Sequence, residues 1–346
     1  EGEESLLNKE NLKKYENMVT ASLFKQHFEE ADESIKSSLF TQYRMHPQIM
    51  DLINVFYENR LKCGLSDPNN ERAHGLNFPS ATHKSLDFVR PNCHAYWIDS
   101  SSLPSGQPFY EQQAGTSKTN PLEVELIIKA LIRINEAQPQ TQFYFENEIQ
   151  RITKLDPAPS EVEQHIQTLQ TLRNKLKEVK QKKRVGIISF YGRQVRDLRN
   201  AIRPLRKQLQ YLEIDINTVD QFQGKEEDII MVSMVRNTSS GRSGSSAYVA
   251  QFERINVALS RAREILMIFC FLYMFRDYEV RLPNLDRPGD NKRYIYKDII
   301  AQLSRNNAIF ESDVLLSLEH DEKSINKLNK DNEAQKSQRP FKRKKQ

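Results

Sequence analysis

Three short segments combine residue types that can bind a nucleotide: Gln42-Tyr43-Arg44, Gln223-Gly224-Lys225-Glu226, and Arg261 with Arg263. An aromatic ring can stack on a base, and guanidinium groups bind phosphate oxygens in a forked geometry. A glycine lets the backbone approach a ligand closely, and a carboxylate can accept a hydrogen bond from a ribose hydroxyl group or from metal-bound water. Each segment alone is a weak signal. If their loops meet at one edge of a parallel sheet, together they predict a nucleotide or phosphate site.

The segments alternate with elements that must hold them in place. Apolar runs predict strands at residues 96–98, 185–190, 214–219, 229–235 and 265–271. Helices are predicted after Asn120-Pro121, after Pro47, and over residues 194–210 with a bend at Pro204. This alternation predicts an α/β fold with a mostly parallel sheet and helices on both faces. The segment before Pro47 would then lie on a strand-to-helix approach, where α/β folds place ligand contacts.

Residues 254–263 carry three arginines and are predicted to form one helix, directly before the strand at residues 265–271. Arg254 and Arg261 would share a face of this helix, whereas Arg263 would point elsewhere. An arginine at the end of a short helix beside a parallel sheet is well placed to meet a phosphate. A surface helix with solvated arginines is the alternative, which this stretch alone does not exclude.

Residues 137–183 are predicted to form a helical insertion in the main domain. Ser160-Glu161-Val162-Glu163 has the pattern of a capping box, and apolar residues then recur at three- and four-residue steps up to Val179. The pattern resembles one arm of a helical hairpin. Two interpretations stay open: a helix that packs on its own domain, and an arm that faces a partner or a nucleic acid.

Composition restricts the class of protein. The chain has 346 residues, of which 38% are hydrophobic and 28% charged, as is typical of a globular protein. Its net charge of +5 is too small to demonstrate a nucleic-acid partner. Cys63, Cys93 and Cys270 form no CxxC pair, which argues against a zinc site and for a reducing compartment, cytoplasmic or, in a eukaryote, nuclear. The polar first residues and the short apolar runs predict no signal peptide and no membrane contact.

Longer versions of the three segments resemble motifs IV, V and VI of the Upf-like superfamily-1 helicases. They are Gln42–Pro47 (QYRMHP), Thr218–Glu226 (TVDQFQGKE) and Asn256–Arg263 (NVALSRAR), and they occur in the family's order. The strand at residues 185–190 is similar to the element before motif V, although Phe190 stands where the family usually has proline. The resemblance implies the second RecA-like domain of a P-loop NTPase motor, with residues 39–316 as the domain.

The resemblance implies catalytic roles for three residues. Arg261 would be the arginine finger, Arg44 would contact the γ-phosphate, and Glu226 would line the site near the ribose. A guanidinium group aimed at the transferred phosphoryl group can contribute about 10³ to 10⁵ in rate. ATP and Mg²⁺ are the implied cofactors, and no metal ligands are predicted within this chain.

Further residues would bind the cofactor or the nucleic acid. Tyr43 would stack on the adenine beside Gln42, Gly224 would line the nucleotide site, and Arg263 would add a supporting charge. Thr218 and His46 are predicted to face the nucleic acid, a single strand of DNA or RNA.

A complete motor of this family needs a first RecA-like domain with a GxxxxGK[ST] loop for phosphates and a DExx strand end for magnesium. The GxxxxGK[ST] loop does not occur in this sequence, and its two Asp-Glu pairs, Asp32-Glu33 and Asp321-Glu322, do not follow predicted buried strands. The chain is therefore interpreted as the second half of the motor, inactive alone, with the first domain supplied in cis or in trans. Residues 1–38 would be a helical lead-in after motif III, and residues 317–346 a polar, basic, disordered tail.

A nucleic-acid-binding or partner-docking module without ATPase activity is the alternative interpretation. The missing phosphate loop, the helical insertion and the basic run at residues 336–346 favour it. Against it, Arg44, Glu226 and Arg261 have little structural reason to occur together without a nucleotide.

Overall fold

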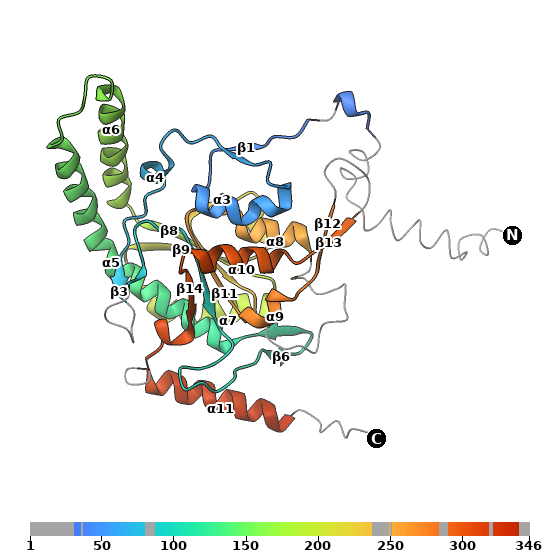
Figure 1. The fold of residues 1–346 in the computed structure, drawn as a ribbon. Coiled ribbons are helices and arrows are strands. Elements are labelled where there is room, and N and C mark those ends of the chain that lie inside the picture. The colour runs from blue at the N-terminus through green and yellow to red at the C-terminus, as the bar shows by residue number, and fades with distance from the viewer. Residues whose placement is uncertain are drawn as a thin grey trace.

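The fold is organised around a six-stranded sheet in the computed structural model, which describes residues 31–35, 37–79, 87–236, 249, 251–283, 290–317 and 321–338. The strand order is β14-β5-β11-β10-β8-β9, and every neighbouring pair runs parallel (Figure 1). The strands are β5 (Ala95–Asp99), β8 (Lys183–Ser189), β9 (Leu212–Thr218), β10 (Glu227–Ser233), β11 (Ala262–Cys270) and β14 (Ile309–Glu311). The predicted parallel sheet is confirmed.

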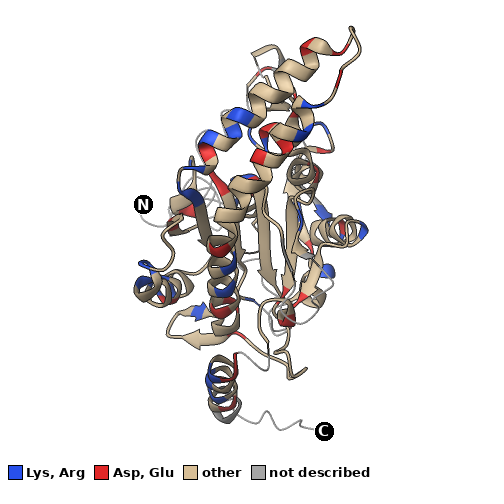
Figure 2. Ribbon diagram, turned by 90° about the vertical axis from the view of Figure 1, so that its left-hand side faces the viewer, with Lys and Arg blue, Asp and Glu red and all other residues tan. Residues whose placement is uncertain are grey.

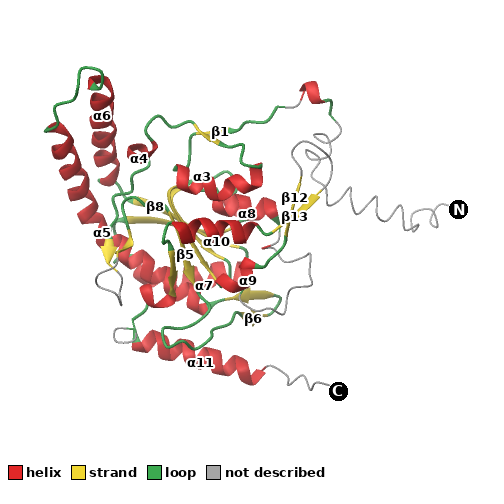
Figure 3. Cartoon of the chain, in the orientation of Figure 1, coloured by secondary structure: helices red, strands yellow, loops and turns green. Residues whose placement is uncertain are grey.

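Helices cover both faces of the sheet, which explains why its central strands are continuous apolar runs. In β11 every residue from Glu264 to Cys270 is buried. One face packs against α5 (Pro121–Thr153) and α7 (Gly192–Ile202), and the other against α3 (Pro47–Asn54), α8 (Phe252–Leu259) and α10 (Ile295–Arg305), as Figure 3 shows. The short helix α9 (Leu272–Arg276) packs on α10. This is the predicted α/β architecture of a RecA-like domain.

Short elements connect the main ones. A parallel pair joins β1 (Thr41–Gln42) to β2 (Lys62–Cys63), and α4 (Pro68–Glu71) follows. Three antiparallel pairs are β3 (Phe78–Pro79) with β4 (Asp87–Val89), β6 (Gln112–Ala114) with β7 (Ser117–Thr119), and β12 (Val280–Pro283) with β13 (Asp290–Arg293). Single 3₁₀ turns occupy residues Glu33–Ile35, Val55–Tyr57, Arg203–Leu205, Asp220–Phe222 and Ser312–Val314.

Two predicted helix starts are confirmed and one predicted helix is shorter. Asn120 caps α5 by accepting hydrogen bonds from the N–H groups of the second and third helical residues, and Pro47 opens α3. The helix predicted over residues 194–210 ends at Ile202 instead of bending. Pro204 has no N–H group with which to continue the helix, so a 3₁₀ turn takes over there.

The prediction of a single helix over residues 254–263 is wrong. Helix α8 ends at Leu259, Ser260 and Arg261 form a turn, and β11 begins at Ala262. Ala262 pairs with Glu227 of β10, so backbone pairing in the sheet replaces the last helical turn. Arg261 and Arg263 therefore lie on a turn and on a strand rather than on two faces of one helix.

The predicted helical hairpin is confirmed, with two corrections to its detail. Helix α5 runs without a break past residue 137, where the insertion was expected to begin, and α6 (Val162–Val179) returns beside it. The expected capping box does not form, because Glu161 is the residue before α6 and makes no side-chain cap. Figure 2 shows basic and acidic residues interspersed along both arms.

The hairpin buries little at its far end. Leu172 and Phe145 form a small cluster with Ala73, whereas Val162 and Ile166 near the start of α6 are 41% and 49% exposed. The outer part of the hairpin therefore gains little of its stability from packing on the rest of the domain.

The prediction that residues 317–346 are disordered is wrong for residues 322–338, which form α11 (Glu322–Gln338). Lys129 on α5 pairs with Asp321 at the start of this helix, and Asn332 Nδ2 donates to the carbonyl oxygen of Pro108 at 2.9 Å. Ile325 and Leu328 of α11 are also buried. This mostly polar helix is therefore held on the domain by two polar contacts and two buried apolar side chains.

The lead-in predicted over residues 1–38 falls mostly outside the described residues, which begin at Ala31 and include the 3₁₀ turn at Glu33–Ile35. None of the described helices combines the length and the apolar character needed to cross a membrane.

Candidate nucleotide site

Arg44 brings the three predicted segments together. Its Nε donates to Glu226 Oε2 at 2.6 Å, and its Nη1 donates to the carbonyl oxygen of Ser260 at 3.1 Å. Partial burial alone would raise the pKa of Glu226, but the hydrogen bond and the charge of Arg44 lower it below its ordinary value. Arg44 and Glu226 keep 33% and 44% of their side chains exposed, so a ligand can reach both.

Arg261 lies next to this pair, one residue after Ser260. Its Nε donates to the carbonyl oxygen of Val257 at 3.1 Å, which turns the side chain back along α8. Burial and the neighbouring charge of Arg44 lower the pKa of Arg261. Within the described part of the chain, Arg261 forms no ion pair. Arg44 is thus paired with Glu226 while the charge of the neighbouring Arg261 is not paired with a described carboxylate, and this excess positive charge favours an anion.

Arg263 is fixed from two sides. Its Nη1 lies 3.6 Å from Asp228 Oδ1, and its carbonyl oxygen accepts a hydrogen bond from the N–H group of His46 at 3.0 Å. Asp228 also pairs with Arg184 on β8. Arg263 therefore joins the start of β11 to the starts of α3 and β10, and adds a third positive charge near Arg44.

Gln42 shapes the turn that presents Tyr43 and Arg44. Its Oε1 accepts hydrogen bonds from the N–H groups of Arg44 at 2.9 Å and Met45 at 2.7 Å, and its Nε2 donates to the carbonyl oxygen of Met45. Because both polar atoms bond within the turn, Gln42 fixes the backbone that carries Tyr43 and Arg44. Tyr43 is 64% exposed.

Two residues that the sequence analysis missed hold this turn. A Cβ atom on Gly64 would lie 2.4 Å from Cε1 of Tyr43, so only glycine lets the tyrosine ring lie against the backbone here. Arg72 donates from Nη2 to the carbonyl oxygen of Tyr43 at 2.8 Å and from Nε to that of Arg44 at 2.7 Å. Neither residue belongs to a motif, so spacing gave no signal.

Gly224 has a backbone φ of 84°, in the left-handed region that favours glycine. No heavy atom lies within 4 Å of the position that a Cβ atom would occupy there. The glycine is therefore required by the shape of the loop before β10, and it leaves open space beside Glu226.

The site lies at the amino ends of β10 and β11, and the turn with Tyr43 and Arg44 lies between β1 and α3, on the predicted strand-to-helix approach. Glu226 and Arg261 directly precede β10 and β11, whose first residues, Glu227 and Ala262, are paired. Thr218 is the last residue of β9 and lies at the opposite, carboxyl edge, where it pairs with Ser189. The residues predicted to bind ATP thus lie at one edge of the sheet. Thr218, which was predicted to bind nucleic acid, lies at the other edge, one strand length away.

His46 is buried and serves the start of α3. Its Nδ1 accepts from the N–H group of Gln48, its Nε2 donates to Asn69 Oδ1 at 3.1 Å, and its ring stacks on that of His94 with centroids 3.4 Å apart. Burial, opposed by the Asn69 hydrogen bond, lowers the pKa of His46. Only 3% of His46 is exposed, which argues against the predicted nucleic-acid contact.

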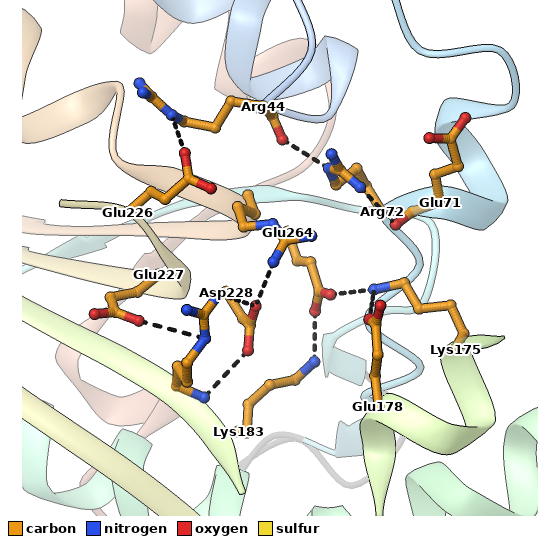
Figure 4. Close-up of polar contacts among 12 residues, drawn as sticks. Arg44, Glu71, Arg72, Lys175, Glu178, Lys183, Glu226, Glu227, Asp228 and Glu264 are labelled. Atoms are coloured by element: carbon orange, nitrogen blue, oxygen red, sulfur yellow. Dashed lines mark hydrogen bonds and ion pairs between the residues drawn. The ribbon is translucent and has the colours of Figure 1, made fainter. Parts of the chain in front are cut away.

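A buried ion cluster lies directly under the arginines and was not predicted. Glu264 follows Arg263 in β11, and its carboxylate binds Lys183 Nζ at 2.5 Å and Lys175 Nζ from α6 (Figure 4). Burial would raise the pKa of Glu264, but the two lysines lower it well below its ordinary value. The cluster fastens the hairpin to the strand that follows Arg261.

The carboxyl edge of the sheet holds a different polar group, centred on Glu123. Its Oε2 accepts from Ser233 Oγ at 2.5 Å and from the N–H group of Val235 at 2.9 Å, and its Oε1 accepts from Ser100 Oγ. Gln194 Nε2 donates to Ser233 Oγ. Burial raises the pKa of Glu123 to about 8. These side chains bond to one another and are buried.

The charges at the amino edge fit a phosphate better than a metal ion. Of the three arginines, Arg44 pairs with Glu226 and Arg263 with Asp228, whereas Arg261 pairs with no carboxylate among the described residues. Among the residues with described positions, no group of three or more His, Cys, Asp or Glu side chains could hold a metal ion. The arrangement can therefore bind and polarise a phosphoryl group, while magnesium ligands would have to come from elsewhere.

Comparison with known proteins agrees with this chemistry. The AAA domain family matches residues 19–272. Helicase sen1 of Schizosaccharomyces pombe is 40% identical over 108 residues, which are 31% of this chain and 6% of that protein. DNA replication ATP-dependent helicase/nuclease DNA2 of Gallus gallus is 27% identical over 254 residues, 73% of this chain and 18% of that protein. Putative helicase mov-10-B.2 of Danio rerio is 24% identical over 266 residues, 72% of this chain and 21% of that protein.

The chain thus spans less than a quarter of each of these relatives, whereas the family match spans most of the chain. The matched region contains all three segments that meet at Arg44. The chain belongs to the AAA domain family that is typical of Upf-like superfamily-1 helicases.

Proposed function

We propose that this chain is the second RecA-like half of an ATP-dependent helicase or translocase that acts on single-stranded DNA or RNA. The contact of Arg44 with both Glu226 and the Ser260 carbonyl group supports this most directly, because it unites segments 182 and 216 positions apart. The helicase names of the similar proteins support the same activity. A first RecA-like domain, in cis or in trans, would supply the phosphate loop and the magnesium ligands.

In this proposal Arg261 is the arginine finger and Arg44 contacts the γ-phosphate. Bound ATP with Mg²⁺ supplies the phosphoryl group and the divalent charge. Arg261 has no carboxylate partner among the described residues, so its charge is available to the developing negative charge on phosphate. Glu226 orients Arg44 through the 2.6 Å hydrogen bond, and Arg263 adds charge from its place beside Asp228.

The base and the nucleic acid contact other parts of the chain. Tyr43, exposed and supported by Gly64, stacks on the adenine, and the open backbone at Gly224 lies against the nucleotide. Thr218 contacts the nucleic-acid backbone at the opposite edge. Closure of the two motor domains around the nucleotide would move the carboxyl edge of the sheet along the single-stranded nucleic acid in each ATP cycle.

The test compares this chain alone with the same chain joined to a first RecA-like domain. ATP hydrolysis is measured with and without single-stranded oligonucleotide. We expect no hydrolysis by the chain alone, and hydrolysis stimulated by nucleic acid for the complete motor. A complete motor that binds ATP but fails to hydrolyse it under any of these conditions would contradict the proposal.

The second candidate function is a nucleic-acid-binding or partner-docking module without ATPase activity. The observation that favours it is that this sequence has no GxxxxGK[ST] loop and no Asp-Glu pair at the end of a predicted strand. It predicts oligonucleotide binding that is insensitive to ATP and to substitution of Arg261. The same ATPase assay therefore separates the two functions.

A further inference from the structure

A cavity of about 530 Å³ lies at the base of the α5–α6 hairpin. It is half-open to solvent and is bordered by α5, by the turn after α6 and by the residues just before β9. None of the described residues that line it belongs to the candidate nucleotide site. Its volume falls in the range of about 300 to 1,000 Å³ that is usual for small-molecule and cofactor sites.

Two exposed aromatic rings line this cavity from different elements. Phe143 on α5 is 64% exposed, and Tyr211 before β9 is 41% exposed. Large aromatic side chains are normally covered, because burying them is strongly favourable. Two uncovered rings beside one cavity offer planar faces on which flat ligands can stack.

Gln138 adds a polar group that lacks a partner. Its side chain lines the cavity and is only 5% exposed, and its Nε2 has no hydrogen-bond partner among the described residues. Buried amide donors in proteins are nearly always paired, because an unpaired donor has lost its bonds to water. The edge of a nucleobase presents carbonyl and ring-nitrogen acceptors that could pair with this amide after a small rotation of the side chain.

The wall that carries Tyr211 is held in place. Asn135 Oδ1 accepts from the N–H group of Tyr211 at 3.0 Å, and Asn135 Nδ2 donates to the carbonyl oxygen of Gln208 at 3.1 Å. The N–H group of Lys183 donates to the carbonyl oxygen of Tyr211 at 2.9 Å. The cavity is therefore formed before any ligand arrives, which lowers the entropic cost of binding.

The charge around the cavity is positive. Lys180 and Lys182 are exposed and line it, and neither forms an ion pair with a residue that the structure describes. The lining carboxylate, Glu146, accepts a hydrogen bond from Gln142 Nε2 at 2.9 Å. Aromatic rings combined with basic groups are the usual means of holding single-stranded nucleic acid.

We propose that this cavity binds a nucleotide of single-stranded nucleic acid, with Phe143 and Tyr211 stacking on the base, Gln138 bonding to its edge, and Lys180 and Lys182 near phosphates. The inference rests on the proposed function in taking single-stranded nucleic acid as the substrate. The site is separate from Thr218, because the seven residues of β9 place the two at opposite edges of the sheet, roughly 20 Å apart.

The test measures binding of fluorescein-labelled single-stranded DNA and RNA to this chain by anisotropy. Phe143→Ala and Tyr211→Ala are each expected to weaken binding roughly tenfold, since each removes a stacking platform. Gln138→Leu is expected to weaken binding about threefold without lowering the unfolding temperature, because the amide it removes has no partner. The matched control is Tyr273→Ala, which removes an aromatic ring that is 60% exposed on α9, and it should leave binding unchanged.

A second measurement locates the site directly. Photo-crosslinking of an oligonucleotide that contains 5-bromouracil, followed by mass spectrometry, should label the peptides that contain Phe143 and Tyr211. The double variant with both aromatic rings removed overturns the proposal if it binds oligonucleotide as tightly as the parent. Binding of poly-L-glutamate that is lost in the same variant, with oligonucleotide binding unchanged, would assign the cavity to an acidic peptide and also overturn it.

These outcomes are independent of ATP turnover. An Arg261→Ala variant should keep full oligonucleotide binding at this cavity, whatever its effect on hydrolysis. Failure of the ATPase proposal and failure of the cavity proposal are therefore seen in different assays.

Discussion

The two edges of the parallel sheet are both rich in polar side chains, but only one of them is left open. At the carboxyl edge Glu123 is fully buried, and serine hydroxyls and a backbone N–H group surround its carboxylate. At the amino edge Arg44 pairs with Glu226 and Arg263 with Asp228, Arg261 pairs with no described carboxylate, and the Arg44, Glu226 and Arg263 side chains are partly exposed. Completeness of hydrogen bonding, rather than polarity, separates a structural cluster from a binding site.

The largest effect should follow from removing Arg261 at the open edge. In the complete motor we expect Arg261→Ala to lower ATP turnover by about 10³-fold or more, because it removes the charge that the proposed function assigns to the transferred phosphoryl group. Nucleotide binding, measured by titration with a fluorescent ATP analogue, should persist. The control Arg276→Ala removes an exposed arginine of α9 and should leave turnover unchanged. Near-normal ATP hydrolysis by Arg261→Ala would contradict the assignment of Arg261 to the ATP site.

Glu264 should give the largest loss of stability. Glu264→Gln leaves Lys175 and Lys183 buried without their carboxylate, so the free energy of unfolding in urea should fall by about 3 to 5 kcal/mol. Asp215→Asn is the control, because it removes an exposed pair with Lys225 and should cost less than about 1 kcal/mol. Equal costs for the two variants would show that the buried cluster contributes no more than a surface pair.

Glu123 tests whether the closed edge is purely structural. Glu123→Gln replaces one of two acceptor oxygens with an NH₂ group, so the N–H donor of either Val235 or Asn120 loses its acceptor, and the free energy of unfolding should fall by about 1 to 3 kcal/mol. Turnover per folded molecule should stay at the parent value. A large loss of turnover with unchanged stability would place the carboxyl edge in the ATP site. The two edges would then no longer differ in function.

His94, buried behind the open edge, should make stability depend on pH. Burial and the neighbouring histidines lower its pKa to about 2 in the folded protein, against 6.5 as its ordinary value, so the unfolded chain binds the extra proton. Its stabilising contribution is present above pH 6.5 and is lost as pH falls, by about 1.4 kcal/mol at pH 5.5.

The measurement is the free energy of unfolding in urea of the parent and of His94→Gln, between pH 7.5 and 5.5. Glu123 titrates in both proteins, so its effect cancels when the two free energies are subtracted. The difference in the free energy of unfolding between parent and variant should fall by about 1.4 kcal/mol over this pH range. Parallel pH curves for the two proteins would contradict the assignment.

Gly224 should give the smallest effect. Gly224→Ala forces a side chain into the left-handed region and should cost about 1 kcal/mol in thermal unfolding, without a clash, because the space beside it is open. A much larger loss would mean that the loop packs more tightly than the structure shows.

Sequence alone predicted five of the six strands of the sheet and the three segments that meet at Arg44, because apolar runs and motif spacing are local signals; the short edge strand β14 was missed. It did not say at which edge of the sheet the segments meet, and the paired starts of β10 and β11 place them at the amino edge. The end of α8 was also missed, because pairing of Ala262 with Glu227 depends on a strand far away in sequence.

The buried ion cluster could not be predicted for the same reason. Glu264 lies 81 and 89 positions from its two lysines, and nothing in the composition of α6 marks Lys175 as buried. The folding of residues 322–338 was missed because a polar sequence was read by composition, whereas Asp321 and Asn332 anchor it through single contacts.

The pairing of Lys175 with Glu264 also has a mechanical consequence. Sliding α6 past β11 would separate buried opposite charges, so the base of the hairpin cannot yield independently of that strand. Helix α4, which contacts α6, ends beside Arg72, and Arg72 grips the Tyr43–Arg44 turn. Two chains of contacts therefore connect the hairpin to the arginines, one through Glu264 in β11 and one through α4 and Arg72. We expect a displacement of the hairpin to move the candidate ATP site.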